Sequence, residues 1–115
     1  MIDWTRVEEL RSEIGGDGLS EIVELFLDEV EGVMMRLLSA PDVATLEQDL
    51  HFLKGSAWNL GFVGFGAICQ DGERRAAAGR GAEVDLRAVA DCYAGSKSAF
   101  MAGLAARGAQ VHSAA

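Results

Sequence analysis

Positive charge and long apolar runs are both scarce in this sequence. Its 115 residues contain ten Lys and Arg against 18 Asp and Glu, giving a formal net charge of −8 and a pI of about 4.6. Such an acidic chain lacks the cations that hold nucleic-acid phosphates or anionic lipids, so we expect no nucleic acid and no membrane as partner. No run approaches the roughly 18 apolar residues of a membrane-spanning helix.

Proline and cysteine are also rare. A single proline, with frequent Ala, Leu, Glu and Arg, favours an all-α domain. Cys69 and Cys92 form no CxxC pattern, so dithiol or zinc chemistry is not indicated. We interpret both as buried free thiols of a cytoplasmic protein. The amphipathic start MIDWTRVEEL agrees with this location, because it has no signal-peptide pattern.

Glycine-rich and proline-marked breaks divide the chain into five predicted helical segments. They cover residues 3–14, 19–38, 43–60, 64–78 and 85–107, each with apolar residues at helical spacing. Asp3 and Asp42 are predicted N-caps, and Gly61 is predicted to end the third segment. The short connections predict an antiparallel, up-down-up-down four-helix bundle over residues 1–108, with the short first helix covering one end. Residues 109–115 are predicted to form a disordered tail.

The stretch HFLKGSAWNLG, residues 51–61, carries reactive groups on a helix that otherwise packs well. At 100° per residue, His51 lies roughly 130° from the centre of the helix's apolar arc, which predicts a surface position. Lys54, Gly55 and Trp58 follow at i+3, i+4 and i+7 and share this face. Glycine costs a helix about 0.5–1 kcal/mol relative to alanine, and here it clears the approach to the imidazole. A nucleophilic imidazole, a cation and a cleared approach together indicate that the histidine carries an anionic group, for which phosphoryl is the natural candidate.

This stretch and its continuation FGAICQDGERRAAAG resemble the histidine-containing phosphotransfer (HPt) domains of bacterial phosphorelays. The resemblance lies in the core H-x-x-K-G-[S/A], which is followed by a leucine–glycine helix end, and the bundle layout extends it to most of the chain. It implies that His51 is reversibly phosphorylated on Nε2. It also implies that Lys54 lies beside the phosphoryl group and that Gly55 admits the partner.

The resemblance also implies a residue that orients the imidazole. In several such domains a Gln or Glu on the following helix hydrogen-bonds the other ring nitrogen. By spacing from the histidine, that position is Glu73 here, and Gln70, one turn earlier, is the alternative.

The helical wheel predicts a partner-docking surface around the histidine. Its members are Ala44, Glu47, His51, Lys54, Gly55, Trp58 and Phe62. An exposed tryptophan suits a protein interface, where aromatic anchors are favoured. Folding of Trp58 over the edge of the core is the alternative, and the sequence does not separate the two.

The rest of a phosphoryl-transfer site is missing from the sequence. It has no Walker A motif, no kinase-like glycine-rich loop and no loop cluster of carboxylates for Mg²⁺. We therefore expect a phosphoryl carrier without kinase activity and without a cofactor of its own. The Mg²⁺ ion and the second carboxylate are expected on the partner, a response-regulator receiver domain, and a hybrid sensor histidine kinase is a further expected partner.

Several alternatives stay open at this point. A metal site on Glu47 and His51 would have only two ligands and no supporting motif. A plain helical interaction module would leave the histidine unused. A dimeric phosphotransferase, or the phospho-accepting domain of a chemotaxis-type histidine kinase, would share the fold, and a segment of a larger kinase would read the same. We expect a monomer, although Met34 and Met35 on the second segment leave a dimer open.

Overall fold

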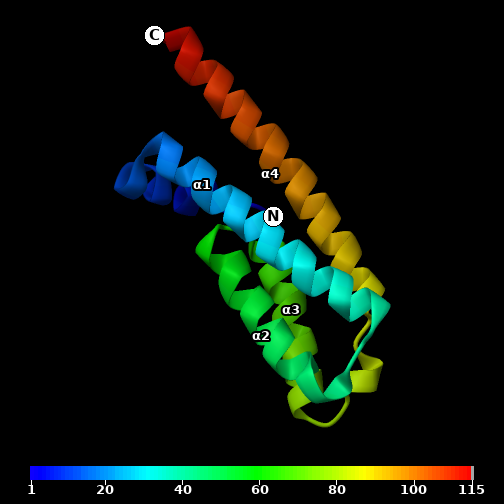
Figure 1. The fold of residues 1–115 in the computed structure, drawn as a ribbon. Helices are drawn as coiled ribbons and strands as arrows, with labels where there is room; N and C mark the ends of the chain where they lie inside the picture. Colours follow the sequence, from blue (N-terminus) through cyan, green and yellow to red (C-terminus); the bar gives the residue numbers. More distant parts are fainter. Residues whose placement is uncertain (115) are drawn as a thin grey trace.

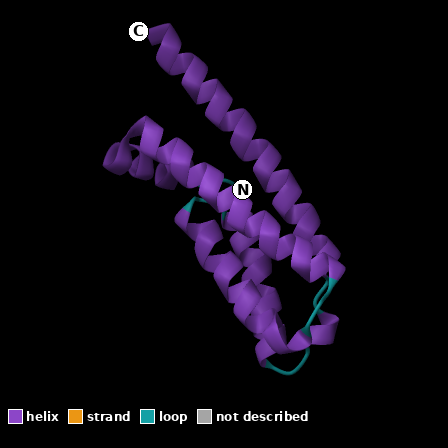
Figure 2. Ribbon diagram, in the orientation of Figure 1, coloured by secondary structure: helices purple, strands orange, loops and turns teal. Residues whose placement is uncertain are grey.

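The computed structural model describes the backbone of residues 1–114 and the side chains of residues 1–107. Four α-helices and one 3₁₀ turn follow one another in the order α1 (Trp4–Ser39), α2 (Val43–Asn59), α3 (Val63–Ala77), η1 (Gly81–Glu83) and α4 (Leu86–Ala114) (Figure 1). Within the described residues there is no strand, and an isolated bridge joins Ile2 to Phe62 (Figure 2). The principal axes measure 54 × 22 × 20 Å, so the helical bundle is elongated. The all-α prediction is confirmed.

Helix α1 unites the first two predicted segments and contains a single break. Gly15 has φ 79° and ψ 168°, whereas the glycines at positions 16 and 18 remain in the helix. The short stretch before this break changes direction relative to the rest of α1 (Figure 1). The prediction that all of residues 15–18 form the break was too broad, because one residue in the left-handed region suffices to redirect a helix.

The predicted caps form, and the N-terminus is tied to the turn between α2 and α3. Oδ1 of Asp3 accepts a hydrogen bond from the backbone N–H of Arg6 at 3.3 Å, and Oδ1 of Asp42 accepts one from Ala44 at 2.9 Å. The backbone N–H of Asp3 donates to the carbonyl of Gly61 at 2.8 Å. Gly61 has φ 85°, as predicted for a residue that ends a helix, and a Cβ there would meet the Asp3 carbonyl oxygen at 2.7 Å.

All four helices contribute to one hydrophobic core. Its most buried large side chains are Val7, Val30, Leu37, Leu50, Leu53, Leu60, Phe62, Phe65, Val89 and Phe100. The ring of Phe62 lies 4.8 Å from that of Phe26 and 5.0 Å from that of Phe100, measured between centroids. The prediction that Phe62 belongs to the docking surface is wrong: the turn at Gly61 directs this side chain inward, where it is fully buried.

Two polar contacts fasten α1 to its neighbours. Arg36 donates two hydrogen bonds to the carboxylate of Asp49 on α2, at 2.7 and 2.9 Å. Glu31 accepts hydrogen bonds from the Tyr93 hydroxyl at 2.7 Å and from Lys97 Nζ at 2.6 Å, both on α4. These contacts hold α1 against α2 and α4 outside the apolar core.

Three minor predictions have mixed outcomes. Met34 is buried and Met35 is 71% exposed, so only the second of the two methionines offers a surface for a dimer. Cys69 is buried, whereas Cys92 is half-buried. The predicted tail, residues 109–115, overlaps the end of α4, which runs to Ala114; none of its side chains is described, and disorder of the tail stays a prediction. In the described part of the chain, no helix combines the length and the apolar character needed to cross a membrane.

Candidate functional site

Helix α2 presents His51 to solvent because its apolar residues turn the opposite face to the core. Leu46, Leu50, Leu53 and Ala57 are buried at helical spacing. The His51 side chain is 69% exposed, which confirms the surface position predicted from the wheel. The ring is therefore accessible to another molecule.

Glu73 on α3 contacts the imidazole from the neighbouring helix. Its Oε2 lies 2.7 Å from Nδ1 of His51. An ionised carboxylate only accepts hydrogen bonds, so this contact places the imidazole proton on Nδ1. In the neutral ring the lone pair is then on Nε2, the nitrogen that Glu73 leaves free. Of the two orienting residues named from the sequence, Glu73 makes this contact, and the described contacts of His51 do not include Gln70.

Lys54 shares the same carboxylate. Its Nζ lies 2.6 Å from Oε1 of Glu73, an ion pair in which the two side chains are only 17% and 18% exposed. Oε1 itself is shielded from water and makes no well-aligned hydrogen bond, so the ammonium of Lys54 balances it by charge. Lys54 first, and His51 to a smaller extent, lower the pKa of the Glu73 carboxyl below its ordinary value despite the opposing effect of burial. Glu73 is thus held ionised between an imidazole and an ammonium.

Gly55 leaves an open surface beside the histidine. It is exposed, and a Cβ built on it would have no atom of the described chain within 4 Å. Its φ is not in the left-handed region, so neither the backbone nor internal packing requires glycine here. The surface beside His51 is therefore open to an approaching molecule.

Trp58 is partly exposed and partly packed, so it combines the two alternatives that the sequence left open: a surface position and a position over the edge of the core. Its side chain is 41% exposed, yet its indole lies against α3 at Gly66, where a Cβ would collide with Nε1. It also lies next to Lys54, whose Nζ is 5.7 Å from the ring centroid. Trp58 is therefore both a surface residue and part of the packing between α2 and α3.

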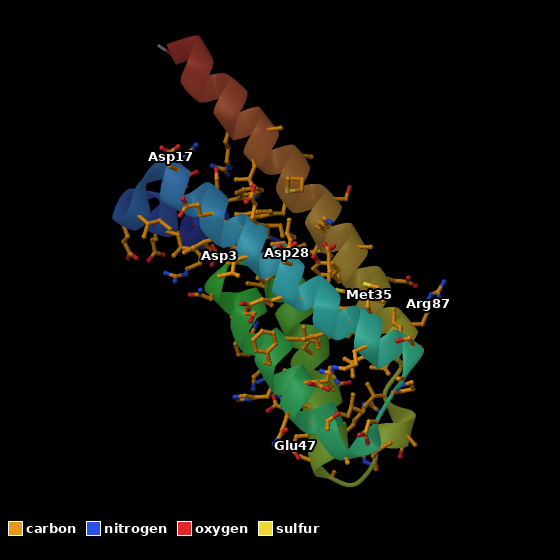
Figure 3. All side chains as sticks on the ribbon, in the orientation of Figure 1. Asp3, Asp17, Asp28, Met35, Glu47 and Arg87 are labelled. Atoms are coloured by element: carbon orange, nitrogen blue, oxygen red, sulfur yellow. The ribbon has the colours of Figure 1, made fainter. Side chains whose placement is uncertain are left out.

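The remaining predicted docking residues lie further along the same helix. Ala44 and Glu47 are exposed on the N-terminal part of α2, and Glu47 is labelled there in Figure 3. On the other flank of α2, Phe52 is 40% exposed and Leu25 of α1 is 58% exposed. Between α1 and α2 a groove is lined by Ile22, Leu25, Phe26, Glu29, Ser56, Asn59 and Leu60. Exposed apolar surface therefore lies on the flank of α2 that the wheel did not include.

Two glycines of α3 set its distance from α2, and the sequence analysis assigned neither of them a role. A Cβ at Gly66 would collide with Trp58, and one at Gly72 would lie 2.9 Å from Cδ1 of Leu50. Both are buried and face α2. The absence of side chains at these two positions lets α3 approach α2 closely, which brings Glu73 within reach of His51.

Metal-binding groups do not gather in this part of the molecule. Among the described residues, no set of three His, Cys, Asp or Glu side chains is arranged to hold a metal ion. The pair of Glu47 and His51 considered from the sequence therefore has no third ligand within the described part of the chain. The arrangement can supply one nucleophilic nitrogen, one cation and one carboxylate.

Comparison with protein-family models gives a match. The family model described as "Hpt domain" matches residues 21–99, which include α2, α3 and the three residues His51, Lys54 and Glu73. No curated protein and no solved structure matches the chain significantly.

Proposed function

Because the chain belongs to the Hpt domain family, whose members carry out histidine phosphotransfer in phosphorelays, we propose that His51 is its phosphoryl-accepting residue. The observation that carries this proposal is the contact between Nδ1 of His51 and Glu73, made while the ring is 69% exposed. It leaves Nε2 unprotonated and accessible on a neutral imidazole. This nitrogen is the site at which the phosphoryl group would be bound.

The transfer step needs no proton movement within this chain. The Nε2 lone pair attacks the phosphorus of an aspartyl phosphate, and the aspartate carboxylate leaves with the electrons of the broken P–O bond. The proton stays on Nδ1, where Glu73 accepts its hydrogen bond at 2.7 Å. The carboxylate thereby stabilises the positive charge that develops on the ring as the new N–P bond forms. The reverse reaction returns the phosphoryl group to an aspartate by the same path.

Lys54 supplies the cation of the proposed site. Its ammonium pairs with Glu73, which also contacts His51. The flexible lysine side chain allows the ammonium to reach phosphoryl oxygens on the histidine. The ammonium would offset the negative charge on those oxygens most strongly in the transition state, in which the phosphoryl group is only partly bonded to the aspartate and to the histidine. In this proposal Lys54 lowers the barrier and Glu73 holds it close to the ring.

The proposed partner is the receiver domain of a response regulator, and a hybrid sensor histidine kinase would be a further source of such a domain. The docking surface comprises Ala44, Glu47 and Gly55 around His51, and we extend it to Phe52 because this side chain is exposed on α2. The Mg²⁺ ion and the acceptor carboxylate would come with the receiver domain.

 The bundle is taken to be an up-and-down antiparallel arrangement in which the stretch of α1 before Gly15 covers the end formed by the α2–α3 turn. The hydrogen bond from Asp3 to Gly61 supports that placement. A monomeric state and a cytoplasmic location complete the proposal.

Transfer from a phosphorylated receiver domain tests the proposal. The wild type and His51→Gln are incubated with receiver domains that carry phosphoryl groups, and the intact mass of each product is measured before and after mild acid treatment. We expect an acid-labile phosphoryl group on the wild type alone. A phosphoryl group on the variant would place the site elsewhere. If no receiver domain of the source organism charges the wild type, the unused histidine of a plain interaction module becomes the better interpretation.

A further inference from the structure

The indole of Trp58 packs at a position of α3 where only glycine leaves enough room. The indole packs against Gly66 of α3, where any Cβ would overlap Nε1 and Cδ1 of the ring. Gly66 is buried in the first turn of α3 and has no positive φ, so its backbone conformation does not require glycine. A glycine inside a helix lowers the stability of the helix relative to alanine. Here its lack of a side chain makes room for the indole of Trp58.

The seated indole forms one wall of the space that Lys54 occupies. Nζ of Lys54 lies 5.7 Å from the ring centroid of Trp58, within the range of a cation–π interaction. On its other side, Nζ lies 2.6 Å from Oε1 of Glu73. The Lys54 side chain is only 17% exposed, although a lysine on a surface helix is usually solvated. Trp58 and Glu73 together therefore confine the ammonium beside His51.

We infer that Trp58 is a positioning residue for phosphoryl transfer, which acts by holding the ammonium of Lys54 at the site. This inference rests on the proposed function. The indole attracts the ammonium of Lys54 without a directional bond, so Nζ can move from Glu73 to the phosphoryl oxygens while it stays near the ring. The ordering of the long lysine side chain is then complete before the partner arrives. Docking of the partner on Trp58 is the competing interpretation.

Single-turnover kinetics separate these two roles. Transfer from a receiver domain that charges the wild type is measured at increasing receiver concentration for Trp58→Ala and Trp58→Phe. We expect Trp58→Ala to lower the rate at saturating receiver about two- to fivefold, the range of an exposed cation–π contact, with little change in the half-saturating concentration. Trp58→Phe, which keeps a smaller ring, should recover part of this loss. Trp4→Phe, at the chain's other tryptophan, is the matched control and should transfer as the wild type does.

A double-mutant cycle with Lys54 makes the test specific. If Trp58 acts through Lys54, Trp58→Ala slows the wild type but has no further effect on Lys54→Ala. An equal loss in both backgrounds, or a change confined to the half-saturating concentration, would overturn the inference in favour of partner docking. An unchanged rate for Trp58→Ala would also overturn it, while phosphorylation of the wild type would leave the proposed function standing. Failure of the wild type to accept phosphoryl from any receiver domain would remove both.

A spectroscopic readout does not depend on the reaction. The indole ring current should shift the NMR signals of the Lys54 side chain upfield in the free protein, and Trp58→Ala should abolish that shift. Gly66→Ala should reduce it, because the added methyl group displaces the ring from its position against α3. Lys54 signals that are the same in the wild type and in Trp58→Ala would contradict the inference.

Discussion

Glu73 and His51 lie 22 residues apart on neighbouring helices, and Oε2 of the glutamate is 2.7 Å from Nδ1 of the histidine. The same carboxylate contacts Lys54 through its other oxygen at 2.6 Å. One side chain of α3 therefore determines both the proton position on the imidazole and the place of the cation.

Replacement of Glu73 tests this shared role. Glu73→Gln removes the charge that stabilises the ring and releases Lys54, so we expect transfer to His51 to slow by about tenfold, on the scale of one charge-assisted hydrogen bond. Asp71→Asn is the matched control, because it removes a carboxylate from the same helix that pairs with Arg75 in an exposed position. Initial rates from a phosphorylated receiver domain measure both. Equal rates for the two variants would show that Glu73 has no special part in the transfer.

Gly55 tests the need for an open approach. Gly55→Gln adds a side chain where the described chain has no atom within 4 Å, so it should raise the free energy of unfolding by about 0.5 kcal/mol through helix propensity. The same side chain should slow phosphotransfer strongly, because it stands beside His51. Urea unfolding and transfer rates give the two readouts.

The matched control for this variant is Gly95→Gln on α4. Gly95 is also exposed, and a Cβ there has no atom of the described chain within 4 Å. We expect this variant to gain similar stability and to keep the wild-type transfer rate. Transfer that is equally fast in Gly55→Gln and in the control would refute the clearance role.

Lys54 tests the electrostatic part of the proposal. Lys54→Ala removes the cation, whereas Lys54→Arg keeps it, so we expect the alanine variant to lose more of the transfer rate. Lys97→Ala, at the chain's other lysine, is the control, since that residue pairs with Glu31 between α1 and α4. Equal losses in Lys54→Ala and Lys54→Arg would point to a packing role for the lysine stem instead.

Acid should destabilise the fold through its paired carboxylates. Arg36, through its hydrogen bonds, lowers the pKa of Asp49 below its ordinary value of 3.8, and Lys97 lowers that of Glu31 below 4.5. The unfolded chain then binds more protons than the folded one, so this stabilisation is complete above the unfolded pKa values and is lost as the pH falls through the folded ones. We expect the urea midpoint to fall from about pH 5 downward. Asp49→Asn should make this decline shallower, and a midpoint that is constant down to pH 3 would contradict the expectation.

Local geometry explains which features could be predicted from the sequence. The exposure of His51 and the face it shares with Lys54 follow from the turn angle of a single helix, so the wheel was sufficient. The inward direction of Phe62 depends on the turn at Gly61 and on rings from α1 and α4, which helical periodicity does not include. The role of Gly66 could not be predicted from its own helix, because it depends on the indole of Trp58 on α2, which occupies the space that a Cβ would need.

The nitrogen that carries the phosphoryl group tests the central claim most directly. Protein labelled with ¹⁵N in its histidines is charged by a receiver domain, and the coupling between ³¹P and the ring nitrogens of His51 is measured by NMR. The contact between Nδ1 and Glu73 predicts that phosphorus couples to Nε2 while Nδ1 keeps its proton. Coupling to Nδ1, or phosphorus on any residue other than His51, would contradict the account.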